Sequence, residues 1–166
     1  VPIETNSEAR AGYVSGRCDV YTTDASGLAA TRSTLPSPGE HMLLPEIISK
    51  EPLGPAVRQG DDQWADIVRW VYNATVTAEE LGVTSSNVDS MKNSNNPEIK
   101  RLLGTEGSQG QELGLSKDWA YQIIKQVGNY GEIFERNIGT NTPIGLARGL
   151  NDLWTRGGLQ YSPPFR

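Results

Sequence analysis

The chain contains very few of the residues that bind metals or act as nucleophiles. Its 166 residues include one cysteine, one histidine and two methionines. A zinc site needs three or four His, Cys or carboxylate ligands at suitable spacing, and no such pattern occurs. A Cys–His pair would need Cys18, in a predicted strand, to meet His41, which follows a Pro-Gly turn. We therefore expect no metal, no cofactor and no cysteine nucleophile.

Three further classes of function are excluded by what the sequence lacks. The net charge is −5, and 15 basic residues are interspersed with 20 acidic ones, so no basic stripe is present to bind nucleic acid. No glycine-rich phosphate loop follows a predicted strand, which argues against nucleotide binding. No apolar run approaches the length of a membrane span. The opening Val-Pro-Ile-Glu-Thr has neither the basic start nor the apolar core of a signal peptide, as expected of a mature or trimmed protein.

The composition is that of a folded chain with many turns. A length of 166 residues corresponds to one domain. The hydrophobic fraction of 36% is low for a complete domain, and 18 glycines and 10 prolines interrupt the pattern. The helical periodicity is nevertheless too clear for a disordered chain. The sequence therefore predicts a turn-rich fold or part of a larger one.

Strand and helix patterns alternate in the first part of the chain. The predicted strands are 2–5, 18–23, 42–44, 47–50 and 56–59, and the predicted helices are 7–15 and 26–35. Asn6 or Ser7 is the expected N-cap of the first helix, and Gly16 is expected to end it. Alternation of this kind predicts an α/β fold with parallel strands and right-handed crossovers.

The rest of the sequence is predicted to be helical. The expected helices are 63–81, 86–92, 97–103, 116–137 and 142–155. Asp61 or Asp62 is the expected N-cap of the first of these helices, and Gly82 is expected to end it. Four tryptophans occur at amphipathic spacing and are predicted to pack in the interior: Trp64, Trp70, Trp119 and Trp154.

Asp24 is the most informative candidate for a binding residue. It follows the predicted strand 18–23 and precedes the helix 26–35, and ligands of open α/β sheets collect at such strand ends. A carboxylate there is placed to hold a ligand ammonium group. Asp is also a favoured N-cap, and a carboxylate with about four acceptor positions can do both. Asn6 lies beyond the preceding strand and is either a helix cap or part of the same crevice's rim.

Four stretches of the sequence resemble one family. Residues 16–24, Gly-Arg-Cys-Asp-Val-Tyr-Thr-Thr-Asp, are similar to the strand of periplasmic amino-acid-binding proteins of ABC importers whose terminal Asp grips the substrate α-amino group. Residues 44–61 resemble the return crossover of the general L-amino-acid-binding branch. Residues 129–137 and 157–164 resemble that branch's long C-terminal tail. The resemblance covers essentially the whole chain but only about the C-terminal half of such a protein.

The resemblance implies a fold and a division of the chain. The fold is α/β, a type II periplasmic-binding-protein-like architecture of two lobes, of which only the C-terminal part is present, with a helical C-terminal tail. Residues 1–48 would be the C-terminal part of lobe II, and 49–54 the returning hinge crossover. Residues 55–82 would be the C-terminal part of lobe I, and 83–166 would form a helical tail packing on it. A sheet without its central strands would expose hydrophobic edges, so we expect the chain to pair with its missing N-terminal half, to self-associate or to rearrange.

The implied function is capture of L-amino acids, with broad specificity, in the periplasm of a Gram-negative bacterium. The implied partners are a membrane permease and the missing half, with a signal peptide in the precursor. The alternative is a prephenate or arogenate dehydratase-like enzyme on the same scaffold, for which only Asp24 could serve as the acid. We expect a binding protein and no enzyme.

The same resemblance bears on the arginine that binds the ligand carboxylate and on Cys18. In the family, the carboxylate-binding Arg and a Gly-Thr-Thr-like loop lie upstream of the matched region, and we find no equivalent in this sequence. Cys18 by itself reads as a small apolar strand residue. The branch carries a second Cys in a neighbouring strand, so the resemblance implies a disulfide of Cys18 in the intact parent, with the partner absent from this chain.

Overall fold

The computed structural model describes residues 3–165, and their regular secondary structure is helical. The α-helices are α1 (Asn6–Val14), α2 (Ala25–Ser33), α3 (Asp62–Glu80), α4 (Val88–Met91), α5 (Pro97–Leu102), α6 (Gln109–Glu112), α7 (Trp119–Val127) and α8 (Tyr130–Asn137). Short 3₁₀ helices are η1 (Pro38–Glu40), η2 (Gly149–Asn151) and η3 (Trp154–Arg156).

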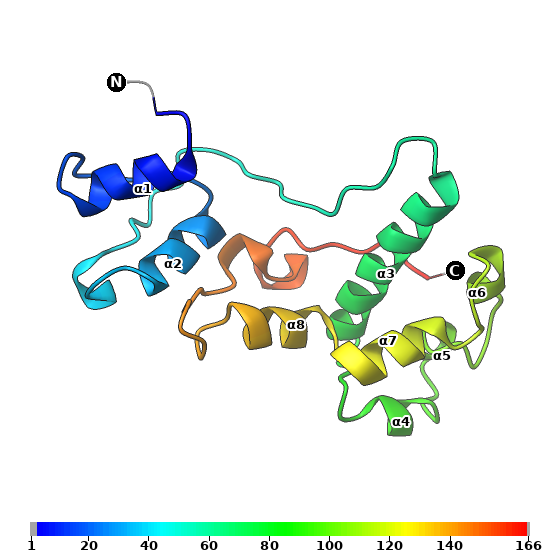
Figure 1. Cartoon of the computed structure of the whole chain (residues 1–166). Helices are drawn as coiled ribbons and strands as arrows, with labels where there is room; N and C mark the ends of the chain where they lie inside the picture. The colour runs from blue at the N-terminus through cyan, green and yellow to red at the C-terminus, as the bar shows by residue number, and fades with distance from the viewer. Residues whose placement is uncertain (1–2, 166) are drawn as a thin grey trace.

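The helices form two groups joined by an extended thread (Figure 1). Helices α1 and α2 lie side by side at the N-terminal end, and residues 41–61 run from them to α3 without regular structure. Helices α3 to α8 form the larger group. The tail after α8 turns back toward α2, where the Arg32 guanidinium donates to the carbonyl oxygen of Ile144 at 3.4 Å. The tail then returns to α3.

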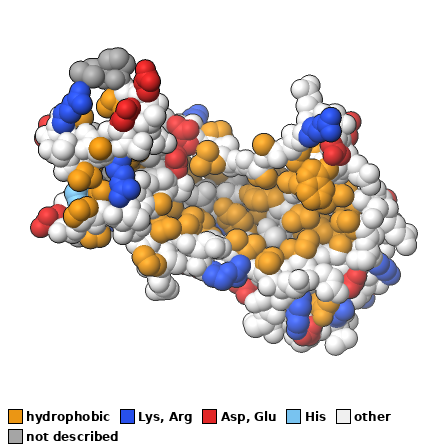
Figure 2. All heavy atoms as spheres, in the orientation of Figure 1, with side chains coloured by type: hydrophobic (Ala, Val, Ile, Leu, Met, Phe, Trp, Pro, Cys, Tyr) orange, Lys and Arg blue, Asp and Glu red, His pale blue; other side chains and the backbone are white. Residues whose placement is uncertain are grey.

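The predicted strands do not form in residues 3–165, where an isolated bridge between Leu153 and Gln160 is the sole β pairing. Residue 2 of the first predicted strand lies outside the described residues. Residues 18–23, 42–44, 47–50 and 56–59 have no neighbouring strand, and a strand cannot exist without a hydrogen-bonded partner. Several of their apolar side chains consequently face solvent: Ile48 is 82% exposed and Met42 80%. Figure 2 shows a broad hydrophobic area over the middle of the molecule and α3, next to the extended thread.

Glycines and capping side chains determine where helices α1 and α3 begin and end. Gly16 (φ +72°) and Gly82 (φ +66°) follow α1 and α3 in left-handed conformations, which confirms both predicted ends. Asp61 caps α3, since its carboxylate accepts from the backbone N–H of Trp64 at 3.2 Å. The predicted caps of α1 are wrong. Thr5 is the N-cap, and its hydroxyl accepts from the backbone N–H of Glu8 at 3.3 Å.

Two of the predicted C-terminal helices are wrong. The segment 116–137 is two helices, α7 and α8, because Gly128 takes φ +86° and Asn129 starts a new helix with a capping box to Glu132. The segment 142–155 is not an α-helix. Gly145 (φ +66°) and Gly149 (φ +49°) adopt conformations that an α-helix does not contain.

The hydrophobic core lies within the larger group of helices. Its members come from α3, α4, α5, α7, the connecting turns and the C-terminal tail: Ala74, Ala78, Val83, Val88, Ile99, Leu102, Leu103, Trp119, Ala120, Ile124 and Phe165. We call the site of Phe165 the aromatic slot. Its ring lies 5.2 Å from Trp70 and 6.3 Å from Trp119 between ring centroids. The interior prediction fails for Trp64 and Trp154, which are 52% and 55% exposed.

A buried ionic cluster holds the tail against α3. The Glu79 carboxylate accepts from both terminal nitrogens of Arg148, at 3.1 and 3.0 Å, and from Arg156 at 3.1 Å. Asp152 lies 3.5 Å from Arg148 and 3.4 Å from Arg156. The Arg148 guanidinium also lies 5.2 Å from the ring centroid of Tyr130. This bidentate geometry fixes the register of the tail on the helix.

Candidate functional site

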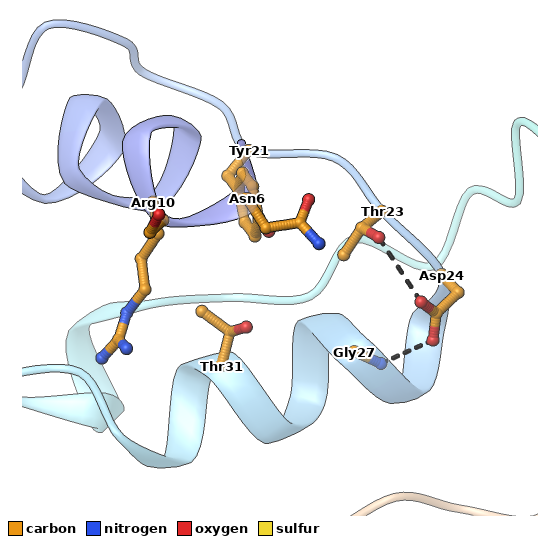
Figure 3. A pocket seen from close by; sticks show the side chains of 8 residues that line it. Asn6, Arg10, Tyr21, Thr23, Asp24, Gly27 and Thr31 are labelled. Atoms are coloured by element: carbon orange, nitrogen blue, oxygen red, sulfur yellow. Dashed lines mark hydrogen bonds between the residues drawn. The ribbon is translucent and has the colours of Figure 1, made fainter. Parts of the chain in front are cut away.

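The candidate binding site is a hollow of about 300 Å³ between α1 and α2 (Figure 3). The residues that line it are Asn6, Ser7 and Arg10 from α1, Tyr21, Thr23 and Asp24 from the segment between the helices, and Gly27 and Thr31 from α2. The structure therefore brings both sequence-predicted residues, Asp24 and Asn6, to one hollow. Most of its lining side chains are polar and able to form hydrogen bonds.

Asp24 is the N-cap of α2. Its Oδ2 accepts from the hydroxyl of Ser26 at 2.6 Å and from the backbone N–H of Gly27 at 2.7 Å. Its Oδ1 has a longer contact, 3.4 Å, to the hydroxyl of Thr23. The hydrogen bond from Ser26, followed by that from Gly27, lowers the pKa of Asp24, so this carboxylate is ionised at neutral pH. The cap is held mainly through one oxygen, which leaves acceptor positions on Oδ1.

Asn6 is the first residue of α1 and does not cap it. Its side chain extends from the N-terminal end of α1 toward Thr23 across the hollow (Figure 3). A carboxamide has both donors and an acceptor, so it can contact either a ligand ammonium or a ligand oxygen. Asn6 is exposed, which agrees with a place at the rim.

Sequence reasoning missed Arg10, the cation of this hollow. It lies four residues after Asn6, so both side chains project from the same face of α1. Its Nη2 donates to the carbonyl oxygen and the hydroxyl of Thr34, both at 3.1 Å. The four-residue spacing was the available signal, and it acquires meaning only once α2 is seen beside α1.

Cys18 and His41 take part in separate contacts. Cys18 is a free thiol of intermediate exposure. His41 Nδ1 lies 2.7 Å from the hydroxyl of Tyr13, and its Nε2 lies 3.2 Å from the carbonyl oxygen of Pro36.

No group of three or more potential metal ligands occurs within residues 3–165. None of the helices in that range is both long and apolar enough to span a membrane.

Comparison with known proteins gives extensive matches along the chain. It is 63% identical to the general L-amino acid-binding periplasmic protein AapJ of Rhizobium johnstonii, over all of this chain and 49% of that protein. It is 57% identical to the glutamate/glutamine/aspartate/asparagine-binding protein BztA of Rhodobacter capsulatus, again over all of this chain and 49% of the relative. No family model matches the sequence.

A solved structure matches the fold. It is an ABC transporter periplasmic binding protein from Brucella ovis with glutathione bound, 60% identical, with a TM-score of 0.93. The match covers all of this chain and 52% of that one. It confirms the predicted periplasmic-binding-protein-like fold, although the strands are absent from residues 3–165. The chain spans about half the length of the curated relatives it matches. Identity at this level, together with the superposition, places the chain in the family of periplasmic amino-acid-binding proteins of ABC importers, of which it represents the C-terminal half.

Proposed function

We propose that this chain forms part of a periplasmic solute-binding protein that captures L-amino acids and delivers them to the membrane permease of an ABC importer. The observation that carries the proposal is the hollow between α1 and α2, with the ionised Asp24 at its edge. The relatives' names support the ligand class and the compartment, since AapJ is named for general L-amino acids and BztA for four polar amino acids. Both names describe binding proteins, which favours solute capture over a dehydratase.

Asp24 would act on the ammonium group of the ligand. A zwitterion entering the site loses water around both charges, and each charge needs charge-assisted hydrogen bonds in return. Oδ1 of Asp24 accepts only the 3.4 Å contact from Thr23 among the described residues, so it can accept a ligand N–H. Oδ2 meanwhile holds the start of α2 through Gly27. One carboxylate thus orients both the helix and the ligand.

We also propose the division of the chain that the resemblance implies. Residues 1–48 would belong to lobe II, 49–54 to the hinge crossover, 55–82 to lobe I and 83–166 to a tail on lobe I. The apolar side chains of Leu44, Ile47 and Leu53 in the extended thread are 65%, 72% and 72% exposed. Exposed apolar side chains of this kind support the proposal that another part of the full-length polypeptide packs against the thread. In the full-length protein that chain would also supply the carboxylate-binding Arg and loop.

The test is the substitution Asp24→Asn in the full-length protein, measured by calorimetric titration with common L-amino acids. Asn is also a good N-cap, so α2 keeps its start while the negative charge is lost. Removing one partner of a buried charge pair costs roughly 3–5 kcal/mol, so affinity should fall about a hundredfold or more. Asp19→Asn is the matched control, because Asp19 is exposed and does not line the hollow. Affinity of the Asp24 variant within about threefold of wild type would overturn the assignment; turnover of prephenate would favour the enzyme.

A further inference from the structure

One hydrogen bond connects the two groups of helices within residues 3–165. Nη2 of Arg32, in the last turn of α2, donates to the carbonyl oxygen of Ile144 in the tail at 3.4 Å. Among the described residues, no other hydrogen bond and no ion pair joins residues 3–41 to residues 62–165. The thread that also links the groups has no regular structure (Figure 1). This contact is therefore the polar tie between them.

The acceptor of this hydrogen bond is carried by a loop that is fixed to the larger group. We call the segment between Ile138 and Arg148 the tail loop. The backbone N–H of Leu146 donates to the carbonyl oxygen of Ile138 at 2.9 Å, which closes the loop at its base. Arg148 then forms the buried bidentate pair with Glu79 of α3. The Ile144 carbonyl is thus held in place relative to α3.

The donor belongs to the helix that begins at the candidate ligand residue. Asp24 is the N-cap of α2, and Arg32 lies eight residues further along the same helix. A helix rises about 1.5 Å per residue, so the two positions are about 12 Å apart along its axis. Because a helix of this length moves as one piece, the contact at Arg32 also fixes where Asp24 lies relative to the larger group.

We propose that the tail loop is a latch, in which the contact between Arg32 and Ile144 holds the two lobes in the arrangement that retains ligand. The inference rests on the proposed function and on the proposed division, in which α2 belongs to lobe II and the tail packs on lobe I. Two-lobe binding proteins close around their ligand by a hinge motion. A hydrogen bond that crosses between the lobes stabilises the arrangement in which it forms and is lost when the lobes separate.

The comparison with the Brucella ovis protein assigns the contact to the ligand-bound arrangement. The TM-score of 0.93 is reached over all of this chain, and a score this high requires that both groups of helices superpose at once. That protein carries bound glutathione. Arg32 is accordingly a positioning residue. It increases the population of the binding-competent arrangement, and the apparent affinity for a ligand rises with that population.

The first test is Arg32→Gln in the full-length protein, with L-glutamate, L-glutamine and L-leucine as probes. Calorimetric titration measures affinity, and stopped-flow fluorescence measures the dissociation rate. Losing one hydrogen bond from a charged donor should weaken binding about threefold to tenfold, mainly through faster dissociation. The factor should be the same for every probe that binds, since the latch does not touch the ligand. Arg17→Gln is the matched control, because Arg17 is exposed and belongs to the same group of helices.

The second test changes the other side of the contact. Gly145 in the tail loop takes φ +66°, a conformation that valine rarely adopts, so Gly145→Val forces the loop to move while α2 keeps its sequence. We expect Gly145→Val to weaken binding by a similar factor and the double variant to be no weaker than either single variant. Should Gly145→Val fail to fold by circular dichroism, Gly145→Ala takes its place in the same cycle.

The outcomes separate the latch from the proposed function. If wild type binds none of the three amino acids, the proposed function fails, and the latch fails with it. If wild type binds and Arg32→Gln keeps its affinity, the latch alone is overturned. It is also overturned if Arg32→Gln weakens binding while the Gly145 variant does not, or if the two effects add fully, because Arg32 then acts only within α2.

Discussion

Replacing Glu79 by Gln should destabilise the protein more than any other change of charge to amide on α3. The Glu79 and Arg148 side chains are 7% and 12% exposed, so the pair is shielded from solvent. Removing one partner of a buried pair leaves the other charge uncompensated and costs roughly 3–5 kcal/mol. Asp152, 3.5 Å from Arg148, retains part of the compensation. Arg156 is 55% exposed and can turn to water. We therefore expect the lower end of the range, about 3 kcal/mol.

Urea unfolding of the full-length protein, followed by circular dichroism, measures this loss. With a slope of about 3 kcal/mol per molar urea, the midpoint of the unfolding step for this region should fall by about 1 M. Asp66→Asn on the same helix is the control, because its pair with Arg69 is 52% and 67% exposed and should contribute under about 1 kcal/mol. A loss below about 1 kcal/mol for Glu79→Gln would show that the cluster does not hold the tail.

Three further changes have directions that follow from the structure. Phe165→Ala empties the aromatic slot and should cost about 3–5 kcal/mol in the same urea assay; a change under about 1 kcal/mol would contradict the packing. Burial raises the pKa of Glu132, but hydrogen bonds from Ser85 and the backbone of Asn129 outweigh it and lower the pKa overall. Its stabilisation is therefore complete above about pH 4.3 and is lost as pH falls through the lowered pKa, so Glu132→Gln should flatten the acid limb of a stability–pH curve. In the full-length oxidised protein, Cys18 should react with maleimide only after reduction and denaturation, and reaction without a reductant would refute the disulfide.

Local chemistry explains which parts of the fold could be predicted. Gly82 and the Asp61 cap act within a few residues, so the bounds of α3 follow from the sequence. Strand 47–50 could not be assessed locally, because a strand exists only with a partner that residues 3–165 do not supply. Gly128 was overlooked because the apolar periodicity of 116–137 continues across it, and the capping box at Asn129 restarts the helix in a new direction.

The candidate site likewise contains residues that could be predicted from the sequence and one that could not. Asp24 and Asn6 were identified because each stands where one predicted element ends and a helix begins. That reasoning needs neighbours in sequence only. Arg10 lies inside a helix, and its role depends on α2 packing beside α1, a contact with Thr34 that is 24 positions distant. A periodicity search finds the helix but does not say which face meets another element.

The separation of the hollow between α1 and α2 from the main core cluster has a consequence for the substitutions that the protein tolerates. The hollow is built from α1, α2 and the segment between them, whereas the members of the core cluster in the larger group of helices all lie from Ala74 onward. Substitutions in distant sites that share no partners have nearly additive effects on stability. Changes at Asn6 or Thr31, which line the hollow, should therefore alter the contacts available in it without lowering the stability of the helical core.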